Sequence, residues 1–154
     1  MDKYQEALAK LGLTFPEMTL PVANFVPYVI TGNLVYISGQ IPMRNGEVVF
    51  VGKLGRDFTV EQCQEAARIC ALNALAILHH ACGGDLDRVA RCVRLGGFIN
   101  STPEFADQPE VMNGASDLIV SVFGERGRHA RAAVGVNSLP RGVAVEVDAI
   151  FEIT

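Results

Sequence analysis

The stretch 129-HARAAVGVNSLPRGVAVEVDAIFEIT-154 contains the pattern that decides the fold of this chain. Two runs of alternating apolar residues lie on either side of the turn 139-LPRG-142, which predicts two strands, at about 131–138 and 143–153, joined as a hairpin. The apolar positions of the second strand are Val143, Val145, Val147, Ala149, Phe151 and Ile153. We expect this face to pack against helices and the other face, which carries Glu146, to be polar.

The same alternation assigns the residues of the first strand of this hairpin to two faces. Its apolar residues are Ala132, Val134 and Val136, and its other side carries Arg131, Ala133, Gly135 and Asn137. If both apolar faces meet the helices, Arg131 and Glu146 share the second face, with small residues between them. Arginine is a planar two-pronged donor and glutamate can activate a water, so this face would suit a small carboxylate. The alternative is an ordinary solvated polar face.

Upstream of this hairpin, the sequence predicts two long helices. The capping box Thr59-Val60-Glu61-Gln62 opens a helix that continues without Pro or Gly as far as Gly83. A second helix is predicted over 109–123, ending at Gly124 and interrupted by Gly114. A strand at about 87–99 lies between them.

The first half of the chain has its own signals. An N-terminal helix is predicted from Asp2 to Leu11, followed by an extended, proline-containing arm over 13–27. The run 33–38 is rich in strand-forming residues and ends at Gly39, and the turn Asn45-Gly46 predicts a hairpin in which 47–51 returns as its partner. The expected fold is an α+β sandwich: a mixed β-sheet with two long helices packed on one face, plus an extra N-terminal helix.

Composition limits the possible functions. The chain has 154 residues, 49% of them hydrophobic and 19% charged, which is typical of one folded domain. A formal net charge of −4 argues against nucleic acid as a partner. No apolar run is long enough for a membrane helix, and the opening MDKYQE is unlike a secretory leader, so we expect a cytoplasmic protein with reduced thiols. The four cysteines form no C-x-x-C pair, and no metal site is expected.

Several motifs have the spacing of a known family. They are Ala130-Arg131, Leu139-Pro140, Val145-Glu146-Val147, 33-NLVYISGQIP-42 and Pro27-Tyr28. Over residues 26–154 the chain resembles the Rid (YjgF, L-PSP) imine-deaminase family, as a longer, divergent branch. The resemblance implies a chorismate-mutase-like fold, a homotrimer whose sheets form an inner barrel, and ligand sites in clefts between subunits. It also divides the chain into a helix and arm, 1–25, and a single domain, 26–154.

The resemblance further implies an activity, the hydrolysis of reactive 2-imino or 2-enamino acids to 2-keto acids and ammonia without metal or organic cofactor. Arg131 would bind the substrate carboxylate with help from the Gly39 backbone, and Glu146 would position and activate the attacking water. The lining residues implied by position are Tyr28, Ser38, Asn113 and Ala133.

The sequence departs from the family pattern at several points. The stretch between Tyr28 and Gly39 is short, His129 stands where the family usually has Pro, and Ala133 where it often has Cys. Two alternative functions remain open: a non-catalytic trimer that binds a 2-keto acid or similar metabolite, and an L-PSP-type endoribonuclease. His129 is either an acid or base beside Arg131 or a solvated loop residue.

Overall fold

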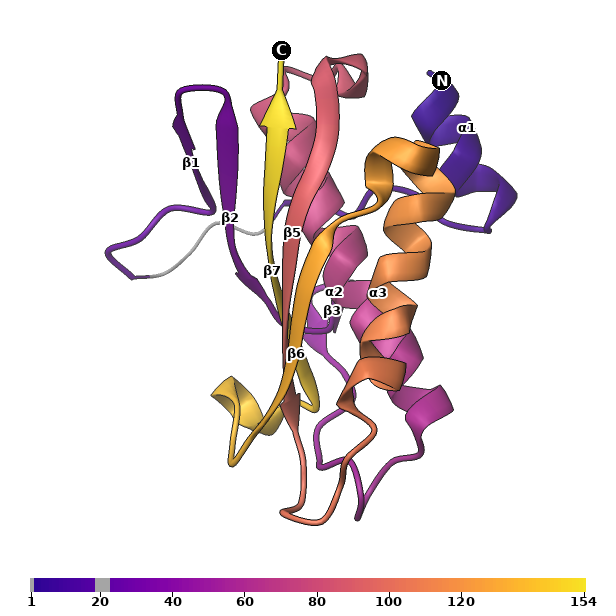
Figure 1. Cartoon of the computed structure of the whole chain (residues 1–154), viewed down its shortest axis with the longest axis vertical. Coiled ribbons are helices and arrows are strands. Elements are labelled where there is room, and N and C mark those ends of the chain that lie inside the picture. The colour runs from indigo at the N-terminus through magenta and orange to yellow at the C-terminus, as the bar shows by residue number, and fades with distance from the viewer. Residues whose placement is uncertain (1, 19–22) are drawn as a thin grey trace.

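The computed structural model describes residues 2–18 and 23–154, which form a mixed β-sheet with helices on one face (Figure 1). The helices are α1 (Lys3–Lys10), α2 (Val60–Ala81) and α3 (Gln108–Phe123). The strands of the main sheet are β1 (Tyr28–Thr31), β2 (Leu34–Gln40), β5 (Val89–Asn100), β6 (Ala130–Val136) and β7 (Val145–Ile153). Three short 3-10 turns are η1 (Leu86–Arg88), η2 (Gly124–Gly127) and η3 (Pro140–Gly142). The predicted α+β sandwich, with two long helices on one face of a mixed sheet, is confirmed.

The strand order is β1-β2-β7-β5-β6, with β5 and β6 parallel and the other neighbours antiparallel. The predicted hairpin between the last two strands is therefore wrong, because β5 lies between β6 and β7. A parallel pair needs a crossover, and α3 provides it between β5 and β6. The connection after β6 then passes the end of β5, and left-handed backbone at Arg141 (φ 57°) and Gly142 (φ 71°) turns the chain into β7.

The predicted alternation of β6 is correct, but each side chain points to the face opposite to the one predicted. Arg131 stands opposite Leu95 in the parallel ladder, and Leu95 stands opposite Ala149 on its other side. Leu95 and Ala149 are both buried under the helices, so Arg131 lies on the helix-covered face. Val134, which we expected to be buried there, lies on the opposite face and is 46% exposed. On this edge strand, the position of α3 decides which side is covered.

Both long helices begin and end where the sequence predicts. The Thr59 hydroxyl accepts from the Gln62 N–H, and the Gln62 side chain accepts from the Thr59 N–H, which completes the capping box of α2. Gly114 interrupts the apolar pattern of α3 because the two helices touch there. A Cβ at Gly114 would lie 2.0 Å from the Gln64 carbonyl oxygen, so only glycine allows this approach.

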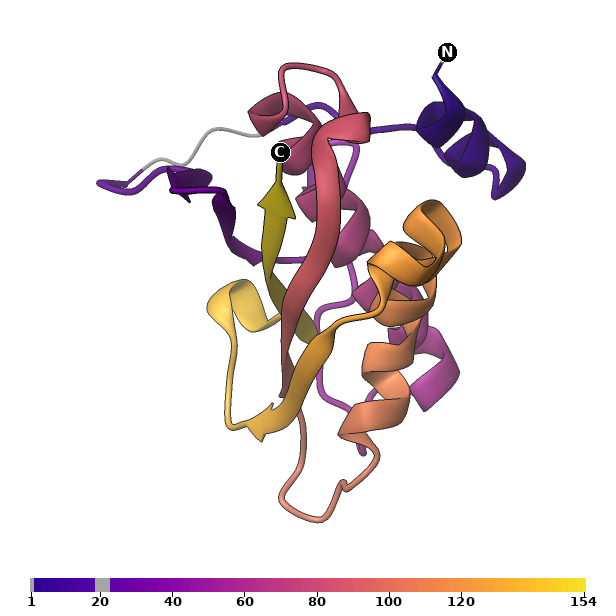
Figure 2. The same cartoon turned by 45° about the horizontal axis from the view of Figure 1, so that its top comes forward.

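The predicted N-terminal helix is also confirmed, with Asp2 as its cap. Figures 1 and 2 show α1 beside the later part of α3. Tyr4 and Leu8 are buried in the same core as the sheet, and the Tyr4 hydroxyl donates to Asp87 and accepts from Arg126. The arm has no regular structure over 13–18, and Pro21 lies outside the described residues. The division of the chain at residue 25 stays a prediction.

The region around β2 differs from the sequence prediction in three ways. Residues 28–31 form strand β1, which the sequence analysis missed, and it pairs with β2 through the tight turn at Gly32 (φ 59°). Strand β2 continues through Gly39 to Gln40, with an irregular register after Ile37. The Asn45-Gly46 turn forms as predicted, but it joins only the short strands β3 (Met43–Arg44) and β4 (Glu47–Val48), so 47–51 does not pair with β2.

Among the described residues, none of the helices combines the length and the apolar character needed to cross a bilayer. All four cysteines are buried and free. Burial raises the pKa of Cys63 and of Cys92 to about 12, so these thiols are inert at neutral pH.

Candidate functional site

Strand β6 and helix α3 together hold the guanidinium of Arg131. Its Nη1 donates to Asn113 Oδ1 at 2.9 Å and to Ser116 Oγ at 3.1 Å, and its Nη2 donates to the Pro109 carbonyl oxygen at 3.3 Å. Asn113 and Ser116 are three residues apart on α3, which places both on the helix face toward β6. The sequence predicted Asn113 as a lining residue, and the structure brings it to Arg131.

The remaining donors of Arg131 are suited to a ligand. A guanidinium has five N–H donors, and the three contacts above leave one on Nε and one on Nη2. Within the described residues Arg131 pairs with no carboxylate. Its side chain is exposed although it is held at three points. Nε and Nη2 form the fork that binds a carboxylate in a bidentate manner.

Ser116 links Arg131 to His129. The Ser116 Oγ lies 2.9 Å from His129 Nε2, and His129 Nδ1 lies 2.6 Å from the Gly127 carbonyl oxygen. His129 is therefore not a solvated loop residue, since it is half-buried with both ring nitrogens bonded. Sequence reasoning named His129 but missed Ser116, although its spacing of three from Asn113 was a signal that the two share a helix face.

Glu146 lies on the other face of the sheet. It stands opposite Phe98 on β5, and Phe98 stands opposite Val134 on β6, so these side chains share the face that none of the described helices covers. Glu146 is half-buried, and its burial, together with the charge of Asp148, raises the pKa of its carboxyl group. A carboxyl group with a raised pKa can act as a general base and then as a general acid near neutral pH.

Gly39 lies directly against Glu146. A Cβ at Gly39 would lie 2.4 Å from Glu146 Oε2, so the glutamate occupies the space that a side chain on β2 would fill. Ser38 precedes it, but its hydroxyl donates to the Val26 carbonyl oxygen at 2.7 Å and anchors the segment before β1. The structure thus places Gly39 beside Glu146, whereas Arg131, which the Gly39 backbone was expected to assist, lies against α3 on the other face.

Two other predicted lining residues lie on the helix side of the sheet. Tyr28 stands opposite the buried Ile37, and its ring packs edge-on against His80 of α2, with centroids 6.0 Å apart. Ala133 is half-buried, stands opposite Gly97 on β5 and packs against the core. Both share the helix-covered face with Arg131 rather than the open face with Glu146.

The expectation that Arg131 and Glu146 share one face is therefore wrong for a single chain. Arg131, with Asn113 and Ser116, faces α3, whereas Glu146 and Gly39 are on the open face. The prediction failed because the side chains of β6 point to the opposite faces from those expected and because β5 lies between β6 and β7.

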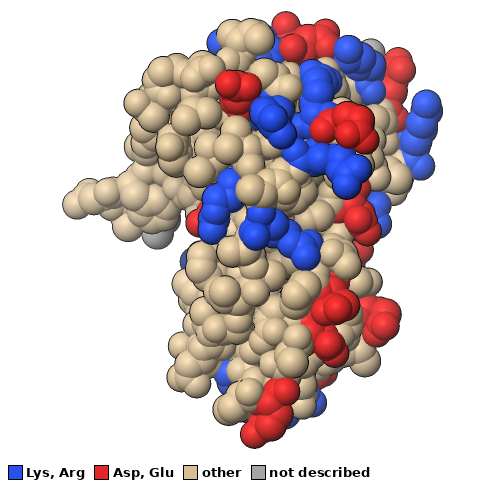
Figure 3. Space-filling model, viewed as in Figure 1, with Lys and Arg blue, Asp and Glu red and all other residues tan. Residues whose placement is uncertain are grey.

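The open face has the character of a contact surface. It carries the partly or largely exposed apolar side chains of Tyr36, Phe98, Val134 and Ile150. Figure 3 shows large uncharged areas over β1, β2 and the lower part of the sheet, whereas Lys and Arg gather in the upper part and across the middle of the view. Exposed apolar patches of this kind on a folded domain mark interaction sites.

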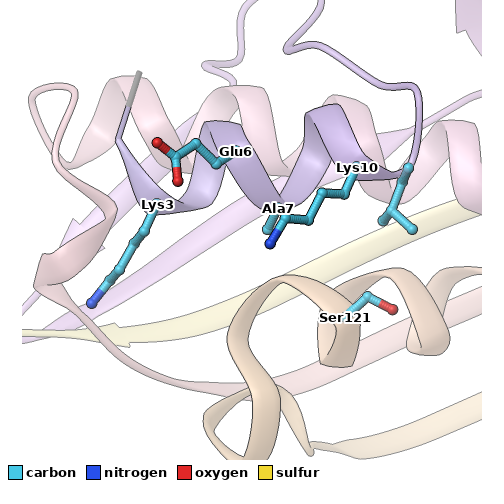
Figure 4. A pocket seen from close by; sticks show the side chains of 6 residues that line it. Lys3, Glu6, Ala7, Lys10 and Ser121 are labelled. Carbon is cyan, nitrogen blue, oxygen red and sulfur yellow. The ribbon is translucent and has the colours of Figure 1, made fainter.

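Two hollows in the described part of the chain lie elsewhere. One of about 370 Å³ separates α1 from α3 and is lined by Lys3, Lys10 and Ser121 among others (Figure 4), and another of about 380 Å³ lies between α2 and α3. Neither includes a predicted site residue. Over 2–18 and 23–154, no three His, Cys, Asp or Glu side chains gather as metal ligands would.

Comparison with known proteins establishes the family. Residues 5–148 match the family described as "YjgF/chorismate mutase-like, putative endoribonuclease", and the chain belongs to it. It is 50% identical to protein TCP17 of Trypanosoma cruzi over 147 residues, which is 95% of this chain and 91% of that protein. The predicted membership of the YjgF (Rid) family and its chorismate-mutase-like fold are thereby confirmed.

Solved structures agree with this fold. A protein of unknown function from Agrobacterium tumefaciens is 50% identical, with a TM-score of 0.93 over 99% of this chain and 94% of that one. TdcF of E. coli, solved with bound serine, is 24% identical, with a TM-score of 0.61 over 89% of this chain and 94% of that one. The second likeness establishes the shared fold.

Proposed function

We propose that this protein hydrolyses reactive 2-imino or 2-enamino acids to 2-keto acids and ammonia, at sites between the subunits of a homotrimer. The observation that carries the proposal is the hydrogen bonding of Arg131: α3 holds its guanidinium at three points and, among the described residues, leaves the Nε donor and one of the two Nη2 donors free. A 2-imino acid has one carboxylate, and this fork matches its geometry. TdcF, a member of the same fold, holds serine, which has a carboxylate of the same kind.

Glu146 supplies the chemistry in this proposal. The ionised carboxyl group takes a proton from water as the water oxygen adds to C2 of the protonated imine, which gives a neutral tetrahedral carbinolamine. Protonated Glu146 then donates this proton to the amine nitrogen. The C–N bond breaks as the hydroxyl oxygen forms the carbonyl double bond and loses its proton to solvent, and the keto acid and ammonia leave. One water is consumed per turnover and the carboxyl group is regenerated. Its raised pKa suits a group that must both accept and donate a proton.

The two faces of the sheet support this subunit arrangement. Because Arg131 and Glu146 of one chain face opposite ways, a site that contains both takes them from different chains. The apolar open face around Glu146 would be covered by the neighbouring subunit. Ala133, Tyr28 and Ser38 would line or support such a site.

The test is a coupled assay in which a serine or threonine dehydratase generates the imine and semicarbazide traps it. Wild type should suppress trapping, and Arg131→Ala should lower kcat/KM by about 10- to 100-fold, as expected for the loss of a charge-assisted contact. Arg131→Lys is the matched control, because it keeps the charge but loses the fork. Trapping unchanged by wild type for several amino-acid-derived imines would exclude the deaminase.

A second function, non-catalytic binding of a 2-keto acid, is favoured by one observation. The three contacts that hold Arg131 all come from its own chain, so carboxylate binding needs no Glu146. Melting shifts with pyruvate in the wild type but not in Arg131→Ala, without any turnover, would identify a binding protein.

A further inference from the structure

The direction of each hydrogen bond around His129 is fixed by its partner. A carbonyl oxygen can only accept, so His129 Nδ1 carries a hydrogen and donates it to Gly127. Ser116 Oγ already accepts from Arg131 Nη1. In the neutral ring, His129 Nε2 has no hydrogen and accepts from the Ser116 hydroxyl. The chain of donors then runs from Arg131 to Ser116 and from Ser116 to His129.

We propose that His129, acting through Ser116, is a positioning residue for Arg131. When His129 is neutral, the Ser116 hydroxyl donates its single hydrogen to His129 Nε2. The Ser116 oxygen is then held in place as the acceptor for Arg131. This inference rests on the proposed function, in which Arg131 binds the substrate carboxylate. A small displacement of a group that binds the substrate lowers the affinity or the rate substantially. Hydrogen bonds that hold this group from the side away from the substrate reduce such displacements.

The surroundings of the ring favour its neutral form. The groups against it are Ser116 of α3, the Gly127 carbonyl of η2 and Arg131 of β6, and the guanidinium is the charged one among them. Burial and the positive charge of Arg131 lower the pKa of His129, against the opposing effect of the Gly127 carbonyl. A protonated ring would instead donate to Ser116 and compete with Arg131 for the same oxygen.

Two matched variants of His129 separate positioning from packing. His129→Gln keeps an acceptor near the position of Nε2 and cannot ionise, whereas His129→Phe keeps the ring but has no acceptor. We expect Ser116→Ala and His129→Phe to raise the Kd for pyruvate by about 2- to 10-fold, the effect of one neutral hydrogen bond, while His129→Gln binds nearly as wild type does. The double variant Ser116→Ala/His129→Phe should bind no more weakly than Ser116→Ala alone.

The pH dependence gives a second readout. Pyruvate affinity of the wild type should fall as pH decreases through the pKa of His129, and His129→Gln should lack this step. An affinity that rises at low pH would mean that the ring acts as an added positive charge, and it would overturn the positioning role. Equal weakening in His129→Gln and His129→Phe would also overturn it, because packing alone would then explain both.

A measurement made without ligand tests the positioning role of His129 separately from the proposed function. Rotation of the Arg131 guanidinium about its Nε–Cζ bond, measured by NMR, should be slow in wild type and His129→Gln, and fast in Ser116→Ala and His129→Phe. Ser121→Ala, an exposed site on the same helix, is the control and should leave the rate unchanged. If no variant changes the rotation, the inference fails; if wild type binds no carboxylate but the rotation changes as expected, only the proposed function fails.

Discussion

Arg131 and Glu146 project from opposite faces of one sheet, with β5 between their strands. Arg131 stands opposite the buried Leu95 and is bonded to α3, whereas Glu146 stands opposite Phe98 and lies against Gly39 on the open face. A chemical step that needs both groups therefore requires two copies of the chain.

The first prediction is complementation between two variants of low activity. When Arg131→Ala and Glu146→Gln subunits are mixed and reassembled, some interfaces pair an intact Arg131 with an intact Glu146 of the neighbour. In the proposed trimer, assembled at random from equal amounts of the two subunits, about a quarter of the sites should regain activity. The imine-trapping assay measures this directly. Mixed assemblies that form but are no more active than the two parent variants would show that the two groups do not act at one site.

The second prediction concerns Gly39. In Gly39→Ala the new methyl group must displace the Glu146 carboxylate, because the two would otherwise be 2.4 Å apart. The displaced group is the end of a side chain, so the melting temperature should change little. Displacement of a catalytic group by about 1 Å can lower kcat by about 10²-fold. The Kd for pyruvate should stay near the wild-type value, and a large rise in Kd together with unchanged kcat would contradict this role.

The third prediction is a pH dependence that originates at Glu146. Its carboxyl group must be ionised to take a proton from water, so kcat should rise with pH through a pKa above the usual 4.5. In Glu146→Gln we expect kcat to fall by about 10²- to 10⁴-fold, with no remaining rise. A pH profile of the purified enzyme checks both.

The same group affects stability with a definite sign. The folded state holds the Glu146 proton more tightly than the unfolded chain does, so the stability contribution of this group falls as pH rises from about 4.5 through the folded pKa. Glu146→Gln should therefore match wild type in acid and melt higher at pH 8. For a chain of this length, each kcal/mol of stability shifts Tm by about 2–4 °C. A lower Tm of the variant at pH 8 would contradict the argument.

The fourth prediction tests the contact between α2 and α3 at Gly114. Alanine is the better helix former by about 1 kcal/mol, so propensity alone favours Gly114→Ala. Its Cβ, however, would lie 2.0 Å from the Gln64 carbonyl oxygen, and backbone cannot move aside without separating the helices. We expect a net loss of about 2 kcal/mol in the free energy of unfolding, measured with urea. Ser121→Ala on the exposed side of α3 should be nearly neutral.

Local features of this protein were determined by short stretches of sequence. The capping residues Asp2 and Thr59, the turn at Asn45-Gly46 and the stop at Gly124 act through bonds within a few residues of themselves. Such signals do not depend on what packs around them. The Thr59 capping box, the Asn45-Gly46 turn and the stop at Gly124 form where the sequence predicts them, and Asp2, the predicted start of the first helix, is the residue that caps it. The alternation of β6 and β7 is equally local, because successive side chains on a strand point to opposite faces.

Only the tertiary structure decided which face of β6 is covered and which strand lies beside it. Alternation shows that Arg131 and Ala133 share a face, but the choice of face depends on where α3 packs and on β5 lying between β6 and β7. That placement also assembles Ser116, His129 and Arg131, which come from two elements and the turn between them. Contacts between elements separated in the chain depend on how layers pack, and no short-range pattern contains that information.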